Sequence, residues 1–150
     1  MTTRSHVHEE SFTAAPAALF ALLHTPSAIR DWWGAARAVV IAEFGGAWAA
    51  AWGESEDQPD YITVATIAEF DPPRRLVLSD YRYHNAAGPL PFEANFVTTF
   101  EVEPAESGAT LRVTQSGFPA GPEADDFYQG CDAGWRATFE GIRRVAEGRE

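Results

Sequence analysis

Segments typical of β-strands follow one another through the middle of the chain, and the connections between them are of two kinds. Each segment is rich in β-branched and aromatic residues and is bounded by Gly, Pro or Asp, which favour turns. Consecutive strands joined in this way pair as antiparallel neighbours, so the pattern predicts a meander within one sheet. The predicted strands are residues 39–44, 47–52, 61–70, 76–83, 92–103 and 110–117.

The connections predict an opening at one end of this meander. Alternate connections of a meander lie at opposite ends of the sheet. The tight connections are residues 45–46, 71–74 and 104–108. The longer or proline-rich connections are residues 53–60, 84–91 and 118–122. We therefore expect the longer segments to surround the mouth of a cavity.

Helices are predicted on either side of the strands, after a first strand at residues 7–13. Pro16 suits the first turn of a short helix that Pro26 ends, and Ser27 is a candidate N-cap for a second short helix. Trp32 and Trp33 of this second helix could shape a cavity wall or an exposed protein-binding surface, with core packing of the helix as the default for at least one of them.

Residues 123–146 form a long amphipathic pattern. Its apolar stripe consists of Phe127, Cys131, Trp135, Thr138 and Ile142. A second stripe consists of the small residues Gly130, Gly134, Ala137 and Gly141. Each glycine costs about 1 kcal/mol relative to alanine inside a helix. The small stripe therefore indicates either a close approach to another element or open space beside the helix.

Composition excludes several classes of protein. The net charge of −11 disfavours nucleic acids and anionic membrane surfaces as partners. All 11 basic residues are arginine, so lysine-based Schiff-base chemistry is excluded. The single cysteine, Cys131, cannot form an internal disulfide, and no apolar run reaches the roughly 20 residues of a membrane span. No nucleotide-binding loop or zinc signature is present. We expect a cytoplasmic protein without a cofactor.

Several motifs, in this order and spacing, resemble a known family. They are Ala15-Pro16 with Phe20 and Leu23, Asp31-Trp-Trp-Gly34, Gly45-Gly-Ala-Trp48, Phe70-Asp-Pro-Pro-Arg-Arg-Leu76, Thr114-Gln-Ser-Gly-Phe-Pro119 and Gly134-Trp135. The pattern resembles bacterial single-domain members of the activator-of-heat-shock-protein-90-ATPase homologue family, in the START-like (SRPBCC) superfamily. Eukaryotic activators carry a further N-terminal domain with an Asn/Trp motif that is missing here, so we do not expect ATPase stimulation.

The resemblance implies an α+β helix-grip fold in a single START-like domain over residues 1–150. A curved seven-stranded antiparallel sheet would surround the long C-terminal helix, with two short helices after the first strand. The first strand would lie beside the last, and a cavity next to the glycine stripe would separate sheet from helix.

Strand alternation predicts which side chains enter that cavity. Side chains of one parity share a face, and we take Leu76, Leu78, Phe100, Leu111 and Val113 as inward-facing. The predicted ligand contacts are then Trp48, Trp52, Thr66, Asp80, Phe96, Thr98 and Gln115 on the sheet, with Cys131 and Trp135 on the helix. A slip in register or a bulge would instead turn Asp80 to solvent.

Three functions are compatible with this arrangement. The favoured one is non-catalytic binding of a small apolar or aromatic molecule, because apolar walls with a few polar groups are typical of small-molecule pockets. The second is a polyketide cyclase-like enzyme in which Asp80 is the acid or base, although no second carboxylate or histidine shares its face. The third is a chaperone-associated interaction module, suggested by the family name and by an exposed Trp32.

The histidines offer little chemistry at this level. His6 and His8 share a strand face and could ligate a metal, but no third ligand stands at a recognisable spacing. We therefore expect both to be exposed and predict no metal site. His84 lies in a predicted mouth loop, where a solvated position is the simplest interpretation.

Overall fold

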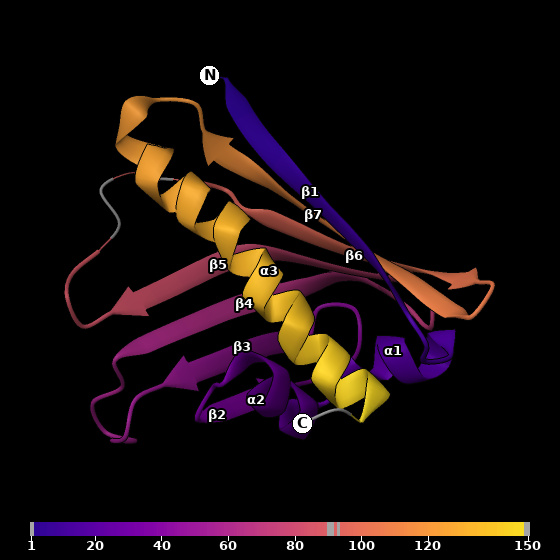
Figure 1. Ribbon diagram of the computed structural model, residues 1–150. Coiled ribbons are helices and arrows are strands. Elements are labelled where there is room, and N and C mark those ends of the chain that lie inside the picture. The colour runs from indigo at the N-terminus through magenta and orange to yellow at the C-terminus, as the bar shows by residue number, and fades with distance from the viewer. Residues whose placement is uncertain (1, 90–91, 93, 149–150) are drawn as a thin grey trace.

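The computed structural model describes residues 2–89, 92 and 94–148 and shows one curved sheet grasping a long helix (Figure 1). The strands are β1 (Thr3–Phe12), β2 (Arg37–Val40), β3 (Ala47–Trp52), β4 (Tyr61–Asp71), β5 (Arg75–Asn85), β6 (Val97–Ala105) and β7 (Gly108–Pro119). Their order is β1-β7-β6-β5-β4-β3-β2, with antiparallel pairing throughout. The predicted α+β helix-grip fold and the pairing of first with last strand are confirmed.

The helices lie against the inner side of the sheet. They are α1 (Pro16–Leu22), α2 (Pro26–Trp33), a 3-10 turn η1 (Pro122–Ala124) and α3 (Asp125–Glu147). In Figure 1, α3 crosses the sheet diagonally and its C-terminal half reaches α1 and α2. The prediction of Ser27 as an N-cap is wrong, because α2 begins at Pro26 with Thr25 at the N-cap position. The Thr25 hydroxyl instead donates to the Ala21 carbonyl at 2.6 Å.

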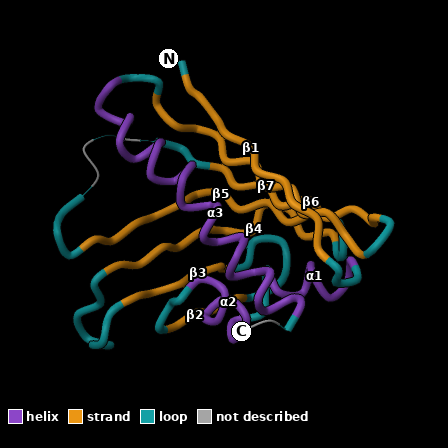
Figure 2. The backbone as a smooth tube through the Cα atoms, viewed as in Figure 1, coloured by secondary structure: helices purple, strands orange, loops and turns teal. Residues whose placement is uncertain are grey.

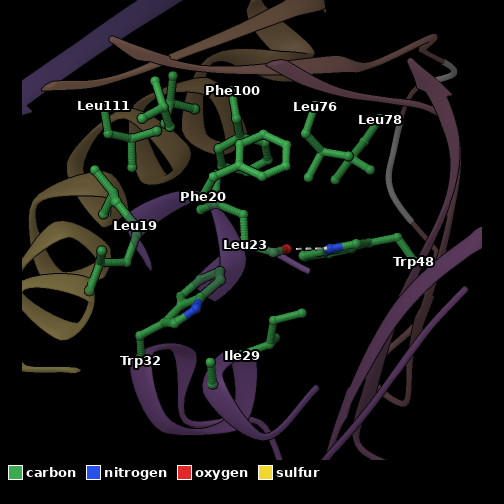
Figure 3. Close-up of a cluster of buried hydrophobic side chains, with 14 of the residues drawn as sticks. Leu19, Phe20, Leu23, Ile29, Trp32, Trp48, Leu76, Leu78, Phe100 and Leu111 are labelled. Atoms are coloured by element: carbon green, nitrogen blue, oxygen red, sulfur yellow. Dashed lines mark hydrogen bonds between the residues drawn. The ribbon is translucent and has the colours of Figure 1, made fainter. Parts of the chain in front are cut away.

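The core forms where the sheet meets the two short helices (Figure 3). The side chains taken as inward-facing on β5, β6 and β7 are all buried, as alternation along a strand requires. They pack against Leu19 and Phe20 of α1, Leu23 at the C-cap of α1, and Ile29 of α2. Trp32 is also buried, at 4% exposure, and its indole N–H donates to the Leu22 carbonyl. The expectation of an exposed Trp32 on an interaction surface is therefore wrong.

The longer connections gather at one end of the sheet, as predicted (Figure 2). The β3–β4 loop and the start of the β5–β6 loop lie at the same edge as the segment that leads into α3, whereas the β4–β5 and β6–β7 turns lie at the opposite edge. Residues 90–91, which belong to the predicted mouth, fall outside the described residues.

Two β-bulges shift the alternation of β4 and β5. Val64 pairs with Arg82 and Thr66 with Ser79, so two residues, Asp80 and Tyr81, stand opposite Ala65 alone. Asp80 adopts a positive φ of 52°, a backbone region that aspartate tolerates better than most residues. A second shift leaves Ala68 as an extra residue in β4. At each bulge the inner face passes from even-numbered to odd-numbered residues of the strand, or the reverse.

The predicted orientations of Thr66 and Asp80 are wrong for this reason. Thr66 lies between the buried Ala65 and Ile67, so its side chain is directed to the opposite face of β4. Asp80 is exposed at its bulge. Neither side chain lines the cavity described below.

Candidate functional site

A cavity of about 140 Å³ lies between the sheet and α3. Every strand from β3 to β7 contributes to its walls, and α2 and α3 close it from the other side. Nine of its lining residues are aromatic, which gives large apolar surfaces with hydroxyl groups at the tyrosine tips. The lining residues are Trp32, Trp33, Trp48, Tyr61, Thr63, Leu78, Tyr81, Tyr83, Thr98, Phe100, Gln115, Phe127, Cys131 and Trp135.

Five of the predicted ligand contacts line this cavity, namely Trp48, Thr98, Gln115, Cys131 and Trp135. Two more lie just behind the lining. The Trp52 ring packs edge-on against Trp33 with ring centroids 4.8 Å apart, and the Phe96 ring packs against Phe127 with ring centroids 5.4 Å apart. A role for any of them in binding a ligand stays a prediction.

A hydrogen-bonded chain holds the polar wall of the cavity together. The indole Nε1 of Trp135 donates to Oε1 of Gln115 at 2.9 Å, and Nε2 of Gln115 donates to Oγ1 of Thr98 at 3.3 Å. The Tyr81 hydroxyl donates to the same Thr98 oxygen at 2.7 Å. The chain links α3 to β5, β6 and β7. Gln115 and Thr98 are therefore engaged with each other and with aromatic side chains across the cavity.

The hydroxyl of Tyr83 is not part of this hydrogen-bonded chain. Its ring stacks on Tyr81 with centroids 5.6 Å apart, yet its hydroxyl makes no hydrogen bond within the described part of the chain. Burial raises the pKa of Tyr83, and the neighbouring Tyr81, Tyr61 and Cys131 raise it further. The Tyr83 hydroxyl thus stays protonated and has its proton available to donate.

The three tyrosines of this wall were not among the predicted site residues. Tyr81 and Tyr83 face inward only because the bulge at Asp80 reverses the parity of β5. Tyr61 faces inward because the bulge at Ala68 does the same for β4. The sequence did carry a signal, since apolar residues alternate on even numbers up to Leu78 and aromatic residues on odd numbers from Tyr81. A change of parity within one strand indicates a bulge.

Acid–base groups are missing from the described lining. None of the lining residues is Asp, Glu, His or Arg. Asp80, the candidate acid or base, is exposed at its bulge instead. An enzyme at this cavity would therefore need a proton-transfer group other than the one suggested by the sequence.

The small residues of α3 have two separate roles. A Cβ atom added at Gly130 or Gly134 would meet no other atom within 4 Å, so these glycines leave open space. Gly134 borders a second hollow that shares Trp33, Gln115, Cys131 and Trp135 with the cavity. A Cβ added at Gly141 would overlap the carbonyl oxygen of Trp32, so this glycine allows α2 and α3 to approach closely.

Cys131 is the one thiol beside the cavity, and burial raises its pKa to about 11. The thiolate is the reactive form of cysteine. A raised pKa leaves the folded protein with a neutral thiol at pH 7, which does not support a nucleophilic role. Cys131 acts here as a small apolar wall residue.

We expect Cys131 to react slowly with iodoacetamide in the folded protein. Its pKa of about 11, against an ordinary value of 9.0, lowers the thiolate fraction at pH 8 by about a hundredfold. Unfolding in urea restores the ordinary pKa, so the rate of alkylation should rise by a similar factor. Mass spectrometry of samples quenched over time measures both rates. Equal rates in the folded and unfolded protein would contradict burial of this thiol.

The fold is that of the START-like proteins, a class known for ligand binding. The chain belongs to the family described as Activator of Hsp90 ATPase homolog 1-like protein, whose model matches residues 13–147. None of the curated proteins matches the sequence. No helix among the described residues is long and apolar enough to cross a membrane.

Solved bacterial structures share this fold over almost the whole chain. Protein MLL2253 from Mesorhizobium loti is 22% identical with a TM-score of 0.78, and the match covers 98% of this chain and 99% of that one. The AHSA1 protein from Silicibacter pomeroyi is 21% identical with a TM-score of 0.70, covering 98% and 100%. Protein SA2116 from Staphylococcus aureus is 8% identical with a TM-score of 0.76, covering 98% and 95%.

Proposed function

We propose that the protein binds a small aromatic molecule in the cavity under α3 without converting it chemically. The observation that carries the proposal is an aromatic-walled cavity in which the hydroxyl of the half-buried Tyr83 makes no hydrogen bond within the described chain. A volume of about 140 Å³ suits a molecule of about one aromatic ring, since apolar cavities of this size accept benzene.

The lining also favours a particular ligand chemistry. The Tyr83 hydroxyl can donate a proton, so a ligand with one hydrogen-bond acceptor on its ring satisfies it. Neither arginine nor histidine is present among the described lining residues, so a carboxylate would be buried without a counter-ion. A neutral aromatic carbonyl or ether therefore suits the cavity better than an aromatic acid.

The proposal includes a cytoplasmic location and excludes nucleic acid and membrane surfaces as partners. The net charge of −11 supports both exclusions. The free thiol of Cys131 supports a reducing compartment.

Two probes of equal size test the hydrogen bond from Tyr83. Benzaldehyde has a carbonyl acceptor, and styrene has the same shape without one. Both should bind the wild-type protein, and benzaldehyde should bind more tightly. Tyr83→Phe should weaken benzaldehyde binding about two- to tenfold, as expected for one hydrogen bond, and leave styrene binding unchanged. Titration calorimetry measures the affinities, and the absence of lysine limits covalent reaction with the aldehyde.

The matched control is Tyr128→Phe, which removes a hydroxyl that donates to the Ser5 carbonyl and does not line the cavity. This variant should bind both probes as the wild type does. Failure of the wild-type protein to bind either probe would contradict a single-ring cavity. An equal loss of both probes in Tyr83→Phe would contradict the hydrogen bond and leave only apolar binding.

A further inference from the structure

A second cluster of polar side chains lies on the other flank of α3, outside the aromatic cavity. His6 and His8 come from β1, and Asp132 comes from α3. Nδ1 of His6 lies 3.0 Å from Nε2 of His8, which lies 3.1 Å from Oδ1 of Asp132. The remaining pair, Nδ1 of His6 and Oδ1 of Asp132, is separated by 4.0 Å. None of the three residues lines the cavity.

This arrangement corrects the expectation that both histidines are exposed. His6 is 7% exposed, because its ring packs against Phe118 and Tyr128 with centroids 5.1 and 5.3 Å away. The third ligand that the sequence pattern lacked is Asp132, which lies far along the chain and is brought to β1 by the packing of α3. Spacing along β1 gave no indication of it.

Proton counting shows that the proton of one neutral histidine cannot fully serve the converging lone pairs of His6, His8 and Asp132. If Nε2 of His8 carries a proton, that proton must serve both His6 and Asp132, and the buried Nε2–H of His6 has no acceptor among the described residues. If Nδ1 of His6 carries the proton instead, the bare Nε2 of His8 faces a carboxylate oxygen at 3.1 Å. Each neutral arrangement of protons leaves a polar group unsatisfied, which is costly where the side chain is buried.

A metal ion satisfies all three converging lone pairs at once. Bonds of about 2.0–2.2 Å at tetrahedral or octahedral angles place ligand atoms roughly 2.9–3.4 Å apart. Two of the three separations already lie in this range. The third, at 4.0 Å, would need a small movement of Asp132, whose side chain is 52% exposed.

We propose that His6, His8 and Asp132 bind a first-row divalent cation of the zinc type. Two imidazoles and one carboxylate suit Zn²⁺ or Co²⁺, whereas Ca²⁺ and Mg²⁺ prefer ligand sets made of oxygen. Three protein ligands leave a position open to water on the exposed side of Asp132. The bound ion would join the edge strand β1 to α3, so binding should also stabilise the fold.

The surrounding charges are compatible with a cation. Arg4 is the basic side chain nearest in sequence, and its guanidinium is engaged with Asp125 at 2.6 Å and lies over the Tyr128 ring. The net charge of the chain is −11. A divalent ion therefore approaches an acidic protein at a site whose neighbouring arginine already has a carboxylate partner.

Titration of the tag-free full-length chain with Zn²⁺, after treatment with a chelator, tests the proposal. We expect one ion per chain by calorimetry, a higher melting temperature with the ion, and visible ligand-field absorption when Co²⁺ replaces Zn²⁺. Asp132→Asn preserves the shape of an exposed side chain, and His8→Gln removes a second ligand. Each should weaken Zn²⁺ binding by about tenfold or more and abolish the thermal shift.

The matched controls are Asp126→Asn, an exposed acid on the same helix, and His84→Gln, an exposed histidine near the end of β5. Both should bind Zn²⁺ with wild-type affinity. The proposal is overturned if the wild-type chain does not bind Zn²⁺ in the micromolar range. It is also overturned if Asp132→Asn and His8→Gln bind as tightly as the controls, which would identify adventitious binding elsewhere.

Discussion

Replacing Trp48 with alanine should lower the free energy of unfolding by about 3–5 kcal/mol, the usual cost of removing a large aromatic side chain from a core. Trp48 is 2% exposed, and its indole N–H donates to the Leu23 carbonyl at 2.9 Å (Figure 3). The ring also packs against the Trp33 ring, with centroids 5.6 Å apart. One side chain thus joins β3 to the end of α1 and to α2, in addition to lining the cavity.

Urea denaturation followed by tryptophan fluorescence and circular dichroism measures this effect. Trp48→Phe keeps an aromatic ring but leaves the Leu23 carbonyl without its donor, so it should cost about 1–3 kcal/mol. Trp52→Phe is the control, because Trp52 is only partly buried and its indole makes no hydrogen bond within the described chain. A loss below about 1 kcal/mol for Trp48→Ala would contradict a structural role.

Gly141→Ala should destabilise the protein, by about 1–3 kcal/mol, whereas Gly134→Ala should stabilise it by about 1 kcal/mol. Alanine favours a helix over glycine at both positions. At Gly141, however, the new methyl group would overlap the Trp32 carbonyl oxygen, so α2 must move away from α3. At Gly134 the methyl group meets no other atom within 4 Å.

Thermal and urea unfolding measure the change in the free energy of unfolding, which should be negative for Gly141→Ala and positive for Gly134→Ala. Gly130→Ala is a second control, because its added methyl group also points into open space. Stabilisation by Gly141→Ala would mean that α2 can move away from α3 without loss of stability. Destabilisation by Gly134→Ala would indicate that the space beside α3 is occupied.

Local sequence patterns predicted the elements of this fold well. Turn residues around β3 to β7 and the helical spacing of α3 are short-range signals, and each is set by the residues of the element itself. The meander order of β2 to β7 followed from the turn pattern, and the position of β1 beside β7 followed from the resemblance to a family. The gathering of the longer loops at one end of the sheet followed from the alternation of tight and long connections.

The site was predicted less completely because inward orientation depends on register. One extra residue at Asp80 and another at Ala68 exchange the two faces of β5 and β4 over the stretch that borders the cavity. The predictions for Thr98 and Gln115, whose strands β6 and β7 pair with each other without such shifts, place both residues at the cavity. Those for Thr66 and Asp80, next to the bulges, do not.

The cluster of His6, His8 and Asp132 was beyond sequence reasoning for another reason. Helical spacing places Asp132 next to the apolar stripe that contains Cys131. It does not say which strand Asp132 faces, because that depends on the rotation of α3 about its own axis. That rotation is set by tertiary contacts such as those of Phe139 and Ile142 with the core.

The distribution of burial along α3 has a consequence for how the cavity exchanges its contents. The buried residues of α3, which are Phe139, Gly141 and Ile142, all lie in its second half. The first half contains Gly130 and Gly134 and contributes Phe127, Cys131 and Trp135 to the cavity. Segments with few buried contacts and poor helix formers open locally at a lower free energy than the rest of a domain. Once contacts such as the Arg4–Asp125 ion pair and the Tyr128–Ser5 hydrogen bond break, we expect the first turns of α3 to open locally and to expose the aromatic cavity without unfolding of the sheet.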